Sequence, residues 1–531
     1  MASKMGRDVS PRARRWEQPV VIGAVGAVFC AVVLLPLLAP MLAVVGGALR
    51  PESARSLATP GPWLLLVRSL LLAAAVTLVA VALGTLLGVL LGRTDVVGRR
   101  VLLLVHAFPM FLPPFLLGLG WFTIFGRQGL AGGEATARFL FHESGHVAIL
   151  GLAFAPIVFT LTALGLWNVD PGLEEAARVV ARPFRVATNI LLPAVRPTIG
   201  LGAILVFALA FSELGVPMFL RVRVYPAAVF SRLGGIDYDP ADAFLLALPL
   251  VPIAALLLGA ERRLLRGRPF DVLGLRHRGR EALPLGRWRW PASLACWALT
   301  VAAVAPLLAL ALRAYRGGGF SEIDRWIGGS LFNSLLSAGM AATAIVVLGA
   351  VVGHACARSL PGSRLLDAVG LLAFVAPAVL FGVGLIALWN RPETRFVYGG
   401  IGIIVLGYIA RYGIVGVRSL TVAISQSPVS LEQAAEAFGA GYLRRLLAIV
   451  LPMHGRALVA TWLLAAVFCL RDLETAVLYY PPGLEPLTVR IFTLEANGPE
   501  PVVAALALVH VLVTAVVLAA GGLWLGGRGS R

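Results

Sequence analysis

Four ionisable side chains lie within long apolar stretches of the sequence, where water is scarce; they are Glu213, Arg471, Asp472 and Glu474. A charge that faces lipid near the bilayer centre costs ~2.5–3.5 kcal/mol, so we expect these side chains to face the protein interior or one another. Glu213 aligns with Asp472 at the same offset that aligns Pro193 with Pro452. Two interpretations stay open: an acidic constriction on a substrate pathway, or a structural pairing of the acids with Arg471.

Other chemical sites are not evident in the sequence. It holds no Gly-x-x-x-x-Gly-Lys-Ser/Thr motif for nucleotide binding, and its only lysine is Lys4. Catalytic triads and metal-ligand spacings are also lacking, and the four cysteines fall inside apolar runs, as small packing residues do. We therefore expect no catalytic residue, no metal site and no cofactor in this chain. Arg411, between Tyr408 and Tyr412, is a weaker candidate pathway residue.

The composition predicts a membrane protein. Hydrophobic residues make up 59% and charged residues 14% of the 531 residues, with a mean hydropathy of +0.88. Soluble domains carry ~25% charged residues. We predict an all-α, polytopic protein in the lipid bilayer with about 12 transmembrane helices. The candidate spans are 20–48, 64–92, 101–125, 146–168, 198–220, 243–260, 292–312, 331–357, 366–389, 399–420, 457–478 and 501–525.

The net charge of +18 is placed asymmetrically. Basic residues gather in the N-terminal tail, in the loop that holds Arg93, Arg99 and Arg100, and in the segment 261–291 with its nine arginines. This positive-inside pattern predicts that both termini are cytoplasmic. It also explains the positive net charge, so we expect no nucleic-acid partner. The apolar run 20–49 is too long for a signal peptide, so we expect an uncleaved first span.

Two polar, helix-favouring segments repeat one another between apolar spans. Residues 173–177 read LEEAA and are followed by Leu192-Pro193, whereas residues 431–435 read LEQAA and are followed by Leu451-Pro452. Alanine and glutamate favour a short helix with its acid near the positive N-terminal end. A proline at the start of the next span costs little, because the first helical N–H has no partner.

The two halves also match in their spans. At one constant offset Gly84, Gly88 and Arg93 correspond to Gly349, Gly353 and Arg358. The paired glycines predict close helix approach, and the equal orientation of the repeats predicts an axis along the membrane normal. We expect four regions: 1–63 with the cytoplasmic tail, first span and outer loop; 64–262 as a first module; 263–329 with the basic linker, seventh span and outer loop; and 330–526 as a second module.

The paired segments resemble the EAA loop of ABC importer permeases, and the two modules together are similar to the fused permeases of the ferric-iron type. The matching residues are Glu175, Ala176, Ala177, Ala181 and Pro193 in the first copy, and Gln433, Ala434, Ala435, Gly439 and Pro452 in the second. The second copy keeps the family's spacing but has Gln433 for the glutamate. The first has Ala181 for the glycine, and its Pro193 comes one residue early.

The resemblance implies that each loop docks on an ATPase subunit and couples ATP hydrolysis to transport. Two copies of a separate ABC ATPase would bind the ATP, and a periplasmic or lipid-anchored binding protein would deliver the substrate in the bacterial inner membrane. The outer segments 237–240 and 484–500 are candidates for that contact. Ferric iron is the favoured substrate, with thiamine, a phosphonate or a polyamine open.

A secondary transporter of the major facilitator type is the alternative. Its members also have about 12 spans in two halves, and residues 95–100, DVVGRR, resemble their loop motif. However, residues 359–363 of the second half, SLPGS, lack the acidic pattern. Paired EAA-like loops also have no role in that family.

Overall fold

The regular structure of the chain is helical. A computed structural model describes residues 11–45, 58–181, 183–234, 240–264 and 282–526, and within them one isolated bridge, Thr94 to Leu283, is the exception to helix. In these residues nine helices are long and apolar enough to cross a membrane, or up to 12 spans if three bent helix pairs each count as one. The predicted all-α, polytopic membrane fold is confirmed.

The helices before the basic linker form the first set. They are α1 (Pro11–Val45), α3 (Pro60–Arg93), α4 (Arg99–Ala107), α5 (Pro114–Phe125), α6 (Glu134–Leu140), α7 (Glu143–Trp167), α8 (Pro171–Val180), α9 (Pro183–Val186), α10 (Leu192–Ser212), α11 (Gly215–Phe219), α12 (Tyr225–Gly234), α13 (Pro240–Ala247) and α14 (Leu250–Leu264).

The second set repeats this order. Its main helices are α15 (Arg289–Arg316), α17 (Ser330–Ala357), α18 (Ser363–Val375), α19 (Ala378–Trp389), α20 (Arg395–Tyr398), α21 (Gly402–Ser425), α22 (Ser430–Ala437), α23 (Tyr442–Arg445), α24 (Leu451–Met453), α25 (Gly455–Leu470), α26 (Ala476–Tyr479), α27 (Leu487–Asn497) and α28 (Glu500–Gly526). The short helix α16 (Ile323–Ile327) lies between α15 and α17.

Glycines let the central helix pair of each repeat approach closely, as their spacing predicted. A β-carbon on Gly84 of α3 would lie 2.6 Å from the Ala155 carbonyl oxygen of α7. A β-carbon on Gly349 of α17 would lie 2.6 Å from the Gly416 backbone of α21. Lipid supplies no hydrophobic force between helices, so this backbone contact is the main source of their packing. Each pair is therefore closely packed.

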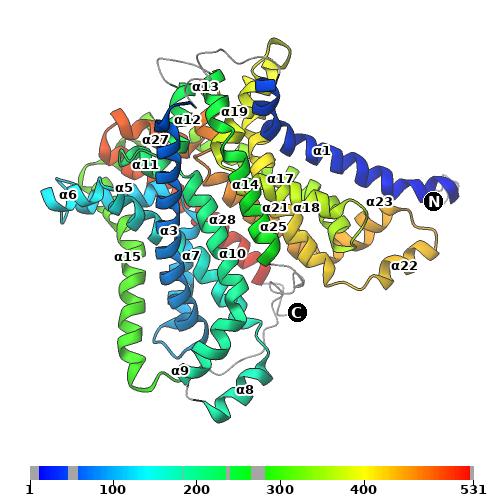
Figure 1. Ribbon diagram of the computed structural model, residues 1–531, viewed down its shortest axis with the longest axis horizontal. Helices are drawn as coiled ribbons and strands as arrows, with labels where there is room; N and C mark the ends of the chain where they lie inside the picture. Colours follow the sequence, from blue (N-terminus) through cyan, green and yellow to red (C-terminus); the bar gives the residue numbers. More distant parts are fainter. Residues whose placement is uncertain (1–10, 46–57, 182, 235–239, 265–281, 527–531) are drawn as a thin grey trace.

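The helix that precedes each repeat packs against the other repeat. α1 lies along α18 and α19 of the second set, and α15 lies along α4 and α5 of the first (Figure 1). Glycine makes both contacts possible, because a β-carbon on Gly384 would overlap the backbone of Pro36, and one on Gly120 would overlap that of Pro306. The exchange joins the two repeats into one body.

Several spans are broken, which corrects two of the predicted boundaries. α4 and α5 meet at a bend of 106°, and α18 and α19 at 105°, each at a proline, Pro113 and Pro377. The predicted fifth and eleventh spans end earlier than expected, at Ser212 and Leu470. The pathway candidates therefore lie at helix breaks, where free backbone groups can bind polar side chains.

Candidate functional site

The first EAA-like loop is the short helix α8 with the turn that follows it. Asp170 caps the helix by accepting a hydrogen bond from the Gly172 N–H at 2.8 Å, and Pro171 occupies the first turn. Glu175 and Ala176 are exposed, whereas Ala177 is buried. Ala181 ends the helix in an extended conformation (φ −136°), which any residue can adopt. This copy therefore needs no glycine.

The second EAA-like loop, built on α22, ends differently. Gly439 has φ +82°, the left-handed conformation that favours glycine, and its N–H bonds the Glu436 carbonyl at 2.8 Å. Gln433 and Ala434 are exposed and Ala435 is half-buried. The first residue of the motif, Glu175 in one copy and Gln433 in the other, is exposed in both. Gln433 can therefore replace the glutamate without loss of an internal contact.

A buried ion pair, which the sequence interpretation missed, attaches each loop to the membrane helices. Glu174 pairs with Arg93 at the end of α3, and with Arg178 at 2.7 Å. Glu432 pairs with Arg358, directly after α17, at 2.7 Å, and with His354 at 2.8 Å. The available signal was the repetition of these acids and arginines at equivalent positions. The likeness to the EAA motif instead favours the adjacent Glu175 and Gln433.

The pKa of these two carboxyls reflects the pairing. Burial raises the pKa of Glu432, but the hydrogen bonds and charges of His354 and Arg358 outweigh it and lower the pKa to about 2. The same balance, with Arg93 and Arg178 as partners, lowers the pKa of Glu174. A carboxyl whose pKa is lowered by folding stabilises the fold at any pH above its ordinary pKa. For Glu432 this stabilisation is lost only as the pH falls toward 2. Both loops are thus firmly attached at neutral pH.

Both loops lead into the next span through a π-helical turn. These turns, Ala187–Leu191 and Leu446–Val450, come directly before the Leu-Pro pairs with Pro193 and Pro452. Proline has no N–H to donate, and a wider turn absorbs the missing helical bond. The second loop has a further attachment, because both carboxylate oxygens of Glu17 in α1 accept N–H groups of Tyr442 and Leu443, at 3.0 and 3.1 Å.

Apolar side chains are exposed around both loops. Val179 and Phe184 project from the first, and Leu431 and Phe438 from the second, with Phe438 95% exposed. The two loops lie well apart in the molecule, α8 at the lower end and α22 at the right of Figure 1. Exposed apolar clusters next to polar helix faces are typical of protein interfaces. The fold thus presents two separate exposed surfaces of similar character, one at each EAA-like loop.

The pathway candidates lie where α10 and α25 end, and two of them cap the short helices that follow. Glu213 accepts a hydrogen bond from the Val216 N–H of α11 at 3.1 Å. Asp472 accepts from the N–H groups of Thr475 and Ala476, both at 3.1 Å, at the start of α26. The two acids therefore play the same structural part in the two repeats.

The two breaks meet in the protein interior. A β-carbon on Gly215 would lie 2.8 Å from the Leu473 side chain, so the first repeat contacts the second at this point. Arg471 crosses the same boundary and donates to the Met110 carbonyl. Glu474 lies between the breaks, close to both Glu213 and Arg411.

Arg411 has a more central place than its sequence suggested. It is fully buried, with its guanidinium 3.8 Å from Asp472 and 4.0 Å from Glu474. Tyr412 donates a 2.6 Å hydrogen bond to Asp472. Within the residues that the structure describes, the second oxygen of Glu213 and one terminal nitrogen of Arg411 have no hydrogen-bond partner. A buried cluster with spare donors and acceptors can bind a polar solute or ordered water.

Metal binding within the chain finds no support in the described ranges. No group of three or more His, Cys, Asp and Glu residues has an arrangement there that could hold an ion.

The sequence is similar to bacterial and archaeal permeases. The "Ferric transport system permease protein FbpB" of Actinobacillus pleuropneumoniae is 24% identical over 456 residues, 80% of this chain and 65% of the relative. The "Fe(3+)-transport system permease protein FbpB 2" of Haemophilus influenzae is 21% identical over 501 residues, 91% of this chain and 94% of the relative. A "Probable molybdenum ABC transporter permease protein" of Haloferax volcanii is 32% identical over 190 residues, 34% of this chain and 68% of the relative.

No family model matches the chain. It spans less than two thirds of the length of two ferric relatives, 65% of the first and 62% of the second. The similarity to ferric permeases includes both repeats, whereas each molybdenum relative matches about a third of the chain. The major facilitator alternative finds no support among these relatives.

Removal of the buried carboxylate of Glu432 should detach the second EAA-like loop from α17. Glu432→Ala leaves Arg358 buried without its partner, which we expect to cost about 3–5 kcal/mol of local stability. Hydrogen exchange of 430–445 should become at least tenfold faster. Glu175→Gln, which copies the second loop in the first, is the control and should leave exchange of 171–181 unchanged. Unchanged exchange in Glu432→Ala would refute the anchor.

Proposed function

The chain belongs to the permease family of ABC transporters, and we propose that it forms both membrane-spanning halves of an importer driven by separate ATPase subunits. The carrying observation is the pair of equivalent docking surfaces, each attached by a buried Arg–Glu pair to the first long helix of its repeat. Two surfaces require two partners of one kind. We infer two copies of an ABC ATPase, which bind the ATP, while this chain carries no cofactor and has no enzymatic activity of its own.

Force from the ATPases would reach the membrane by two routes. Glu174 and Glu432 connect the loops to α3 and α17, which pack tightly on α7 and α21. The first π-helical turn continues directly into α10, whereas the second continues into the short helix α24, which meets α25 at a bend of 82°. The far ends of α10 and α25 carry the breaks at Glu213 and Asp472. Closure of the ATPase dimer thus moves rigid helices whose ends close the interior, as alternating access requires.

The substrate is delivered on the opposite side by a periplasmic or lipid-anchored binding protein. In Figure 1, α27 (Leu487–Asn497) lies at the upper left and α22 at the right, so the segment 484–500 is a candidate for this contact. The other candidate, 237–240, lies outside the described residues except for Pro240.

Ferric iron is the proposed substrate. The support is the likeness to ferric permeases over 80% and 91% of the chain, together with the carboxylates at the breaks. The membrane is the bacterial inner membrane, with both termini and both EAA-like loops in the cytoplasm, because the basic residues gather on that side.

A charge placed on the second docking surface tests the coupling role. Phe438→Asp puts a carboxylate at a 95% exposed position that we assign to the ATPase interface. Co-purification of the ATPase should fall at least tenfold, since a charge buried at an interface costs several kcal/mol. Phe396→Asp, at an 82% exposed position beyond the other end of α21, is the matched control. Equal ATPase recovery with both variants would reject docking at α22.

Single-cysteine labelling tests the orientation, in a background without the four native cysteines. Gln433 and Glu393 lie beyond opposite ends of α21 and are both exposed. A membrane-impermeant maleimide should label Glu393→Cys in intact spheroplasts and label Gln433→Cys only after permeabilisation. Labelling of Gln433→Cys in intact spheroplasts would reverse the proposed orientation.

Neutralisation of Glu213 tests the cation pathway. Glu213→Gln keeps the shape and can still accept the Val216 N–H, whereas Asp472 has too many partners for a clean replacement. We expect ferric uptake into proteoliposomes with both partner proteins to fall about tenfold, while ATPase association is retained. Unchanged uptake would make Glu213 purely structural.

A further inference from the structure

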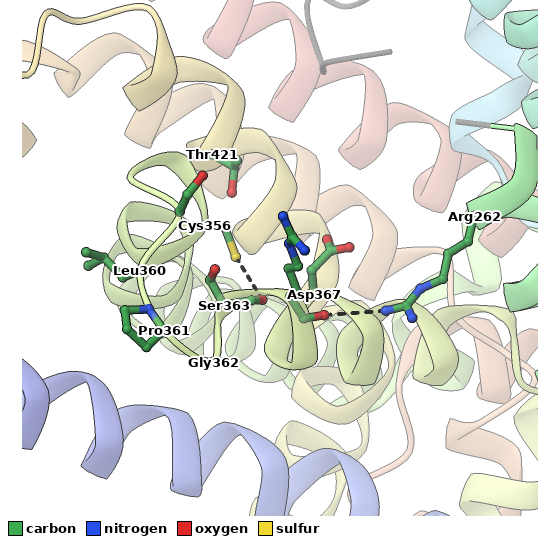
Figure 2. A pocket seen from close by; sticks show the side chains of 10 residues that line it. Arg262, Cys356, Leu360, Pro361, Gly362, Ser363, Asp367 and Thr421 are labelled. Atoms are coloured by element: carbon green, nitrogen blue, oxygen red, sulfur yellow. Dashed lines mark hydrogen bonds between the residues drawn. The ribbon is translucent and has the colours of Figure 1, made fainter. Parts of the chain in front are cut away.

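A cavity of about 620 Å³ opens beside the loop between α17 and α18. Arg262 reaches it from the end of α14, while Cys356, Ser363 and Thr421 line its other side (Figure 2). Arg358, at the start of this loop, pairs with Glu432 of α22. The cavity therefore lies at the membrane face that carries the EAA-like loops.

The charge of the cavity is positive. The Arg262 guanidinium donates to the Arg364 carbonyl at 3.4 Å, and within the described part of the chain the Arg364 guanidinium has no hydrogen-bond or ion-pair partner. The one lining carboxylate, Asp367, accepts two hydrogen bonds from Arg418 at 3.0 and 3.1 Å, and Arg418 also donates to Glu261 at 2.7 Å. Three arginines (Arg262, Arg364 and Arg418) therefore face two carboxylates, and the sum is positive. Two arginines are thus available to an anion.

An apolar groove of about 580 Å³ adjoins the cavity and shares Leu360, Pro361 and Gly362 with it. It runs between α1 and α18, with Ile22, Ala27 and Leu365 among its lining residues. Gly23 also lines it, and a β-carbon there would meet nothing within 4 Å. A cationic cavity continuous with an apolar groove is complementary to a molecule with an anionic head and a hydrocarbon tail.

At the equivalent position of the first repeat, the loop is covered. There the α3–α4 loop is covered by the linker, because Leu283 donates to the Arg93 carbonyl at 2.8 Å and Leu285 to the Asp95 carboxylate at 2.9 Å. Trp297 of α15 adds a bond to the Val97 carbonyl at 3.2 Å. In the second repeat the counterpart of α15 is α1, which is helical from Pro11 onward and borders the α17–α18 loop across the apolar groove.

We propose that the cavity and groove together bind one anionic phospholipid. Its phosphate contacts Arg262 and Arg364, and one acyl chain lies between α1 and α18. Basic pockets between transmembrane helices on the cytoplasmic side bind such headgroups. The proposed lipid site follows from the observed geometry. It rests on the proposed function only where this membrane face is called cytoplasmic.

Native mass spectrometry of the delipidated full-length protein tests the site, with phosphatidylglycerol and phosphatidylcholine as probes. Phosphatidylglycerol should bind with one saturable site. Arg262→Ala and Arg364→Ala should each weaken it about fivefold, the usual contribution of one arginine near an anionic surface. Arg263→Ala, an exposed neighbour outside the cavity, is the control and should change nothing.

The groove is tested by filling it. Gly23→Leu should weaken phosphatidylglycerol binding at least fivefold, because its side chain enters space that the acyl chain needs. Gly339→Leu on α17, where a β-carbon also meets nothing within 4 Å, should have no effect. The ATPase docking readout should be normal in both variants, so failure here is separable from failure of the proposed function.

Three results would overturn the proposal. Equal binding of phosphatidylcholine would remove the role of the arginines. Competition by millimolar inorganic phosphate, with Gly23→Leu without effect, would indicate a site for a free anion instead. Binding that appears only after deletion of residues 1–10 would make the N-terminal tail the natural occupant.

Discussion

The buried pairing of one arginine and one glutamate at the base of each repeat is the interaction on which the arrangement of this chain depends. An arginine at the end of a membrane helix can remain buried only if a carboxylate neutralises it, and in both repeats that carboxylate comes from the EAA-like loop. The cost of separating such a pair fixes the loop to the helix. Motion of the loop must therefore become motion of α3 or α17, and a flexible tether could not transmit it.

The helix that precedes each repeat packs on the other repeat. This joins the two repeats and explains how two such loops can act on one interior. α1 packs on the second repeat and α15 on the first, at glycines that permit backbone contact. The symmetry is incomplete at the loops that follow α3 and α17. The linker covers the first, whereas the second borders an open cationic cavity. A repeat protein can thus acquire a one-sided site without altering its matched core.

The buried acids Glu213 and Asp472 stabilise the helix breaks, and they differ in what they leave available to a solute. Glu213 and Asp472 satisfy backbone N–H groups that a helix break would leave unpaired, which explains why acids can persist there. Asp472 is engaged within its own repeat by Tyr412 and by the N–H groups of Thr475 and Ala476. One oxygen of Glu213 has no hydrogen-bond partner among the described residues, so the two acids differ in what they can offer a solute.

The sequence by itself determined the all-α membrane fold, and it predicted about 12 spans, where the described residues hold nine or up to 12. It also predicted the repeat and the position of both loops. These follow from hydropathy, glycine spacing and the placement of charge, which act over short stretches of chain. It did not determine that Glu174 and Glu432, rather than Glu175 and Gln433, hold the loops, because burial depends on partners far away in the chain. The central place of Arg411, the breaks at Ser212 and Leu470, and the exchange of α1 and α15 likewise depend on tertiary packing. Only the folded chain decides which charged groups meet, since a buried charge is stable solely where distant segments supply its counterpart.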